Sequence, residues 1–195
     1  MYHESFRHAS FWAFLFSVDE DLAKDTRVAG CACGGRLHGA NFPRKPRGVA
    51  REKLPESYRY RLSFCCERDG CRKRKTPPSV RFLGRKVYLG AIVVLVAAMR
   101  QGPSPRRVRE LTELFGADVR TIARWRKLWR EHFPQTPFWK VARGRFSPPL
   151  ATAELPRALL EAFLPSENSP EDWGRLLRFL APITITGGLV IEGNF

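Results

Sequence analysis

Hydrophobic residues recur at helical spacing near the start of the chain. Between residues 9 and 27 they lie three or four positions apart, and acidic residues fill many of the positions between them. This pattern is typical of an amphipathic helix that packs one face on a protein core. We therefore interpret residues 1–30 as an N-terminal structural helix. Its expected inward positions are Phe11, Phe14, Leu15, Val18 and Leu22.

The spacing changes to alternation at residues 58–64. Aromatic or aliphatic residues occupy every second position there, which predicts a half-buried strand. A return strand is expected to include the basic run at residues 72–75 together with Val80 and Phe82. The alternating apolar positions are Tyr58, Tyr60, Leu62 and Phe64.

Three helices are predicted from residue 84 onward, because the spacing returns to that of a helix. They cover residues 85–100, 105–115 and 118–132; Gly116 breaks the second helix and Asp118 can cap the third. Three helices in this arrangement predict a trihelical helix-turn-helix, in which the third helix enters the DNA groove. The expected inward positions are Val108, Leu111, Leu114, Phe115, Val119, Ile122, Trp125, Leu128 or Trp129, and Phe133.

The third helix carries cations on the side opposite this inward stripe. Arginine can donate two hydrogen bonds to guanine in the major groove, and threonine can contact a thymine methyl group. Lysine and arginine also neutralise phosphates. The alternative is that exposed cations only keep the helix soluble. The candidate DNA-contacting residues are Arg120, Thr121, Arg124, Arg126, Lys127 and Arg130 on this helix and Arg72, Lys73 and Arg74 in the basic run.

The last third of the chain is expected to hold a linker and a helical tail. Residues 134–149 mix prolines, aromatics and cations and are interpreted as a linker, with a strap along DNA as the alternative. Residues 153–164 and 170–180 have helical spacing in an acidic background, which indicates contact with another protein. The final residues have strand character without a predicted role. The chain thus divides into residues 1–30, 31–83, 84–133 and 134–195.

Five cysteines lie in two close groups, CACGG and CCERDGC. Two such knuckles around one tetrahedral ion form a zinc ribbon, although Cys31-x-Cys33 is shorter than the usual Cys-x2-Cys. We expect Cys31, Cys33, Cys71 and either Cys66 or Cys65 to hold Zn²⁺. Cys66 is preferred, because Cys-x4-Cys with a glycine before the last ligand closes a tighter knuckle. The alternative is buried free thiols. An odd cysteine count without a secretory signal argues against a disulfide framework.

Positive charge is concentrated in the middle of the chain. The chain has 34 Lys and Arg residues and 19 Asp and Glu residues. Residues 31–145 contain 28 of the basic residues and only 8 of the acidic ones, so acidic residues slightly outnumber basic ones at both ends. Such a surplus attracts polyanions and is typical of nucleic-acid binding. The most apolar run, residues 87–99, is about thirteen residues long, whereas a membrane span needs about 20. Together with the free cysteines, these features predict a cytoplasmic, nucleoid-associated protein without a membrane segment.

The segments CACGG and FCCERDGCRKR, followed by SPRRVRELTELFGADVRTIARWRKLW, resemble the small zinc-ribbon and helix-turn-helix proteins of bacterial insertion sequences and transposons. The similarity covers residues 31–133. It implies a mainly α protein with a small β zinc ribbon and a Zn²⁺ ion on Cys31, Cys33, Cys66 and Cys71. It also implies recognition of element DNA, as a regulator or an accessory of transposition. Expected partners are double-stranded DNA and, through the helical ends, a transposase or another protein.

Other functions are alternatives to this interpretation. A transposase of the acidic-triad kind needs three carboxylates on a sheet of alternating strands and helices, a pattern that this sequence lacks. We therefore predict no enzyme and no small-molecule substrate. An RNA-binding or ribosome-associated zinc protein would stack unpaired bases on Tyr58, Tyr60 and Trp139. A protein-interaction adaptor would instead use the helical ends of the chain.

Overall fold

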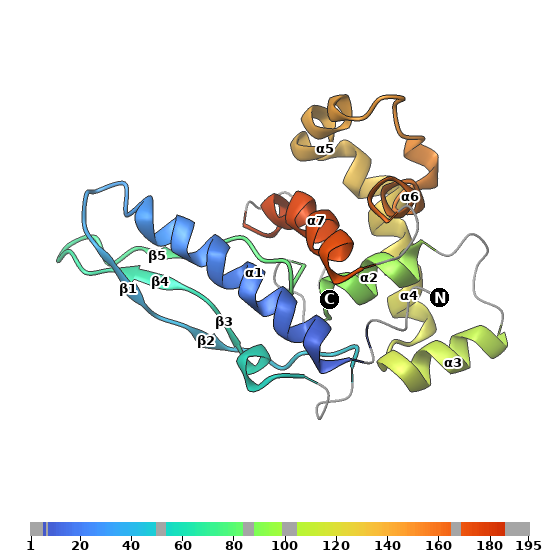
Figure 1. The fold of residues 1–195 in the computed structure, drawn as a ribbon, viewed down its shortest axis with the longest axis horizontal. Coiled ribbons are helices and arrows are strands. Elements are labelled where there is room, and N and C mark those ends of the chain that lie inside the picture. Colours follow the sequence, from blue (N-terminus) through green and yellow to red (C-terminus); the bar gives the residue numbers. More distant parts are fainter. Residues whose placement is uncertain are drawn as a thin grey trace.

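Helices make up most of the structure, and a small antiparallel sheet extends to one side along the first helix (Figure 1). The computed structural model describes residue 6 and residues 8–49, 54–83, 88–98, 105–164 and 169–185. The helices are α1 (Ala9–Val28), α2 (Gly90–Ala97), α3 (Pro105–Phe115), α4 (Val119–Lys127), α5 (Pro137–Ala142), α6 (Arg157–Phe163) and α7 (Pro170–Leu180). The strands are β1 (Leu37–Gly39), β2 (Phe42–Pro43), β3 (Tyr60–Arg61), β4 (Phe64–Cys66) and β5 (Arg74–Lys75).

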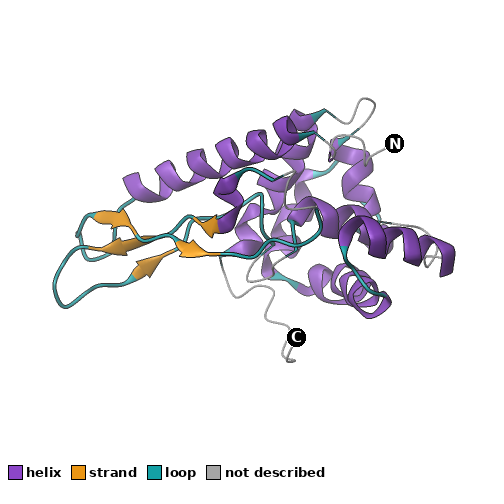
Figure 2. Cartoon of the chain, turned by 90° about the horizontal axis from the view of Figure 1, so that it is seen from below, coloured by secondary structure: helices purple, strands orange, loops and turns teal. Residues whose placement is uncertain are grey.

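The predicted N-terminal helix is confirmed as α1, although its buried face differs in detail. Phe14 and Leu22 are only half-buried, whereas Trp12 and Asp19 are fully buried. The first half of α1 packs against α7, and Ala23 in its second half joins the small core under the sheet. One helix therefore connects the sheet to the rest of the protein (Figures 1 and 2).

The sheet is shorter than the predicted alternation implied. Strand β4 pairs with β1 on one side and β5 on the other, all antiparallel, and β2 pairs separately with β3. The strand predicted at residues 58–64 is interrupted between β3 and β4, where the Ser63 N–H donates to the Asn41 side chain, and its polar positions Arg61 and Ser63 are buried. The return strand contains only Arg74–Lys75, and the expected members Val80 and Phe82 lie in the main core instead.

The predicted second and third helices correspond to α3 and α4. A short turn joins them, and Gly116 in this turn has a left-handed φ of 62°. The third helix was predicted to continue as an α-helix to residue 132, but a π-helical turn, Leu128–His132, replaces its last part. Of the predicted first helix, the structure shows α2, and residues 84–87 and 99–104 lie outside the described residues. The side chains of Val108, Leu111 and Leu114 are likewise not described.

The segment predicted as a linker is folded into the core. Residues 137–142 form α5, in which Trp139 is buried and its ring lies 5.2 Å from that of Phe133. The acidic tail forms α6 and α7, and Trp173 of α7 packs edge-on against Phe11 of α1. The tail therefore completes the protein's own core. Residues 186–195 lie outside the described residues. Among the helices that are described, none combines the length and apolarity of a membrane span.

Candidate metal centre and DNA-binding helix

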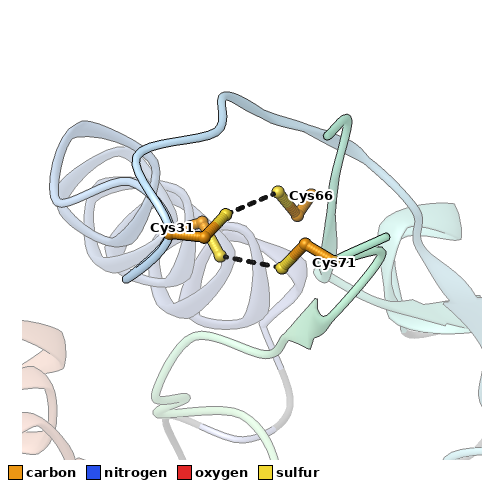
Figure 3. A group of neighbouring side chains, drawn as sticks. Cys31, Cys66 and Cys71 are labelled. Atoms are coloured by element: carbon orange, nitrogen blue, oxygen red, sulfur yellow. Dashed lines mark hydrogen bonds between the residues drawn. The ribbon is translucent and has the colours of Figure 1, made fainter. Parts of the chain in front are cut away.

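Four cysteine sulfurs converge at the end of the sheet. The Sγ atoms of Cys31, Cys33, Cys66 and Cys71 all lie within 4.8 Å of one another. The Sγ atoms of Cys31 and Cys71 are 3.7 Å apart, and those of Cys33 and Cys66 are 3.5 Å apart (Figure 3). Thiolates bound tetrahedrally to Zn²⁺ at about 2.3 Å are about 3.8 Å apart. The four sulfurs are thus spaced to hold a metal ion.

Cys65 does not belong to this cluster. Successive side chains of a strand point to opposite faces, so Cys65 and Cys66 diverge on β4. The Cys65 thiol lies 3.3 Å from the carbonyl oxygen of Arg72, to which it donates a hydrogen bond, whereas Cys66 is fully buried among the other sulfurs. The structure therefore brings Cys66 into the cluster and leaves Cys65 beside it.

Three of the sulfurs accept a hydrogen bond from the backbone two residues further along the chain. Such N–H groups favour a thiolate, because they place partial positive charge beside the sulfur. The backbone therefore turns around the sulfur in the same way at three of the four cysteines. The pairs are Gly35 to Cys33, Arg68 to Cys66 and Lys73 to Cys71.

The sulfurs differ in how readily they ionise. The N–H of Gly35 and the neighbouring thiols lower the pKa of Cys33 to about 6. At Cys66 the N–H of Arg68 lowers the pKa. Burial and the neighbouring sulfurs together outweigh this effect and raise the pKa to about 12. This asymmetry is expected where several thiols share one site, because one thiolate disfavours the next. A divalent cation would offset that repulsion.

Gly35 provides the space for this arrangement. A Cβ atom at this position would lie 2.5 Å from the Sγ of Cys66 and 2.9 Å from the Cβ of Arg68. Both distances are far shorter than van der Waals contact, so only glycine allows the first cysteine loop to approach the second this closely.

A buried ion cluster fixes α1 against the segments beyond the sheet. Asp19 is fully buried, and its Oδ2 accepts hydrogen bonds from Arg81 Nε at 2.7 Å and Ser79 Oγ at 2.6 Å. Its Oδ1 accepts one from the Val80 N–H at 2.6 Å, and Arg61 Nη1 lies 4.0 Å from Oδ2. Burial lowers the pKa of Arg61 to about 10, so this residue stays charged at neutral pH. The Arg81 guanidinium also lies over the rings of Phe16, Tyr58 and Phe82.

The prediction missed this cluster. Asp19 lies in one acidic run with its exposed neighbours Glu20 and Asp21, but it follows Leu15 by four residues and so falls on the apolar face of the predicted helix. An acidic residue on the apolar face of a predicted helix is the sequence signal that could have indicated a buried carboxylate.

α4 is held by a capped start and a buried face. The Asp118 carboxylate accepts a hydrogen bond from the Thr121 N–H at 2.7 Å, which lowers the pKa of Asp118. Ile122 and Trp125 are buried, as predicted. The Trp125 ring lies edge-on 4.9 Å from the ring of Tyr88, whose hydroxyl donates to the carbonyl of Gly116. These contacts fix the turn and the helix together.

The exposed face of α4 differs from the prediction at two positions. Thr121 was expected to face DNA, but it is 6% exposed, and its Oγ1 accepts a hydrogen bond of 2.9 Å from Arg124 Nη2. Val119 was expected to face the core, but it is 59% exposed. The buried stripe of α4 begins at Thr121 and Ile122, and this leaves Val119, the first residue of the helix, on the exposed side. The exposed cations of this region are Arg120, Arg124, Lys127 and Arg130.

Arg126 and Lys127 differ in their surroundings. Arg126 is half-buried, and burial lowers the pKa of its guanidinium. Lys127 Nζ lies 3.7 Å from a carboxylate oxygen of Glu131, an exposed ion pair that contributes little stability.

The cations of the sheet lie at its outer edge. Arg72, Lys73 and Arg74 are exposed, and Arg72 has a left-handed φ of 44° in the turn after the last cysteine. Arg74 donates a hydrogen bond of 2.8 Å to the carbonyl of Ala40, and its guanidinium lies 5.6 Å from the centre of the Phe42 ring. Lys73 is thus a solvent-facing cation close to the cysteine cluster.

Two aromatic residues expected to stack on RNA are inaccessible. Tyr58 and Trp139 are buried, and the Tyr58 hydroxyl donates to the carbonyl of Trp12. Tyr60 is half-buried against Phe16. Tyr58 and Trp139 therefore offer no surface on which bases could stack.

Comparison with known protein families, with curated proteins and with solved structures finds no match. The functional assignment therefore depends on the geometry of the cysteine cluster and of α4.

Proposed function

We propose that the protein is a zinc-dependent, sequence-specific DNA-binding protein of a mobile element, acting as a regulator or accessory of transposition and not as an enzyme. The observation that carries the proposal is the exposed cationic face of α4, which follows a glycine turn and a capped start. The mobile-element role is supported by the resemblance of the cysteine groups and the helix-turn-helix segment to transposon-encoded proteins. Its partner is double-stranded DNA, and its location is the nucleoid.

Arg124 is the residue best placed to recognise a base. It is exposed near the middle of α4, and Thr121 accepts a hydrogen bond from its guanidinium. A held guanidinium loses less conformational freedom when it binds guanine O6 and N7. Lys127 and Arg130, further along the same region, are suited to phosphates.

The four cysteines would hold the metal in a structural role. Four thiolates fill a tetrahedral coordination sphere and leave no position for a substrate. A tetrahedral sulfur site suits Zn²⁺ and also iron, so metal analysis of the purified protein decides between them. The bound ion would stabilise the ribbon and thereby position Lys73 and its neighbours beside the DNA backbone.

The test is a selection of preferred duplexes from random DNA, followed by salt titrations. Arg124→Ala should weaken binding to the preferred duplex by about 1–3 kcal/mol and leave non-specific affinity nearly unchanged. Lys73→Ala should weaken all duplexes alike and reduce the salt dependence by about one unit of slope, because a phosphate contact releases counterions. Arg178→Ala, an exposed cation on α7, serves as the matched control.

Two outcomes would contradict the proposal. Equal losses for the Arg124 and Lys73 variants on every sequence would make the protein a general polyanion binder. Structured RNA that outcompetes the preferred duplex would favour the RNA-binding alternative.

A further inference from the structure

Val119 is an apolar residue that the fold leaves in water. In the part of the chain that the structure describes, the large exposed hydrophobic side chains are Val28, Val119, Val141 and Ile185, and Val119 is the one that belongs to α4. It is the first residue of the helix and is 59% exposed. An exposed valine gains free energy from any contact that removes it from water.

The surroundings of Val119 define what that contact is. Ala123 lies one helical turn further along the same face and is exposed, so the two side chains form a small apolar step. Arg120 and Arg124 flank this step and are exposed as well. The nearby Asp118 carboxylate is engaged by the Thr121 N–H. A partner that presents a small apolar group surrounded by closely spaced negative charges fits this surface.

The thymine 5-methyl group meets that description. It is an apolar group exposed in the major groove, between the phosphates of the two strands. The first residues of a recognition helix are the ones that contact base edges. Thr121, the sequence-based candidate for this contact, is buried and bonded to Arg124.

We infer that Val119, supported by Ala123, contacts the 5-methyl group of a thymine in the preferred duplex, and that Thr121 acts indirectly by orienting Arg124. This inference rests on the proposed function, because it requires α4 to lie in a major groove. Val119 is then a specificity-determining residue for a T·A pair next to the base pair that Arg124 contacts.

The experiment removes the methyl group and the valine separately. Each thymine of the preferred duplex is replaced in turn by deoxyuridine, which lacks only the 5-methyl group. The wild-type protein should lose about fourfold in affinity at one or two positions, as expected for one buried methyl group. Val119→Ala should bind the thymine duplex more weakly and show no further loss with deoxyuridine. Val141→Ala, at another exposed valine, should respond as the wild type does.

The outcomes separate this inference from the proposed function. A preferred duplex that tolerates deoxyuridine at every position, or a Val119→Ala protein that still responds to it, overturns the contact and leaves DNA reading by α4 intact. The absence of any preferred duplex overturns both. Circular dichroism of the variants checks that both valine substitutions leave the fold unchanged, as expected for exposed side chains.

Discussion

We call strands β1–β5 with the two cysteine loops the cysteine ribbon, and α2–α7 with the first half of α1 the helical body; the two regions differ in the size of their apolar cores. The body has a core to which α1, α2, α4 and α7 all contribute, with buried tryptophans at Trp12, Trp129, Trp139 and Trp173. The core under the ribbon consists of Ala23, Leu37, Phe64 and Cys66, together with the partly buried remainder of the cysteine cluster. So small an apolar cluster supplies little hydrophobic free energy, and small domains of this kind usually depend on a metal.

The ion cluster around Asp19 lies between these two regions. It joins α1, which runs along the ribbon, to Arg61 of β3 and to Ser79, Val80 and Arg81. Three kinds of interaction thus differ along one chain: a cysteine cluster spaced to hold a metal ion at the tip, buried charge at the junction and apolar packing in the body.

The largest effect is expected from removing the metal ion that we propose the four cysteines hold. Structural Zn²⁺ sites bind with about 10–16 kcal/mol of apparent free energy near pH 7, so chelation or Cys71→Ser should unfold the ribbon. Hydrogen exchange should become fast at β4 and stay slow at α7. Cys65→Ser, outside the cluster, should retain about one Zn²⁺ per chain. An unchanged ribbon in metal-free protein would show that the ribbon does not depend on a metal ion for its stability.

Breaking the junction should be the next largest effect. Asp19→Ala leaves Arg81 and Arg61 buried without their carboxylate, which should cost about 3–5 kcal/mol of unfolding free energy. Denaturant unfolding measures the loss, and Asp21→Ala in the same acidic run is the matched control, because Asp21 is exposed. Equal stability of the two variants would contradict a structural role for Asp19.

Truncation in the body should have a comparable effect without involving the metal. Trp125→Ala removes the ring that packs on Tyr88 and should destabilise the protein by about 3–5 kcal/mol. The zinc content should not change, since Trp125 is far from the cysteines in the sequence and belongs to the other core. Loss of zinc from this variant would mean that the two regions fold as one unit.

A smaller effect is expected from filling the space at Gly35. The added Cβ of Gly35→Ala would collide with the Sγ of Cys66, so zinc affinity should fall by about 10–100-fold, as for other residues that support metal ligands. Gly39→Ala in β1 is the control, because no atom lies within 4 Å of its added Cβ. Competition with a chromophoric chelator measures both affinities, and equal values would argue against close approach of the two cysteine loops.

The smallest effect concerns the cap of α4. Asp118→Ala should lower the Tm by about 2–4 °C at pH 7, whereas Asp118→Asn, also a good cap, should lower it less. Because the N–H of Thr121 lowers the pKa of Asp118 in the folded state, its stabilisation is present above the unfolded pKa of about 3.9 and is lost as pH falls through the lower folded value. Thermal melts of the helical signal from pH 7 down to pH 3 should show the wild type losing its advantage over Asp118→Asn as the carboxylate is protonated, because the Asn cap does not titrate.

Some of this structure follows from short stretches of sequence. The helical spacing of residues 9–27 predicts α1, and Gly116 and Asp118 mark the turn before α4, because turn and cap geometry depend on adjacent residues. The two cysteine groups predict a cluster of sulfurs. The spacing Cys-x4-Cys favours Cys66 over Cys65 as its fourth member. The helix, the turn and the cap depend on the local backbone, whereas the cysteine cluster joins distant residues and is indicated by the residue type and grouping of its members.

Other features were decided only by the tertiary structure. Distant segments decide that Val119 is exposed and that Thr121 and Asp19 are buried. They also decide that the segment predicted as a linker folds into helix α5. Periodicity says that a helix has an apolar face, but the width and start of that face are set by its neighbours. A buried carboxylate is stable only because Ser79 and Arg81, sixty residues away, meet it in the folded chain.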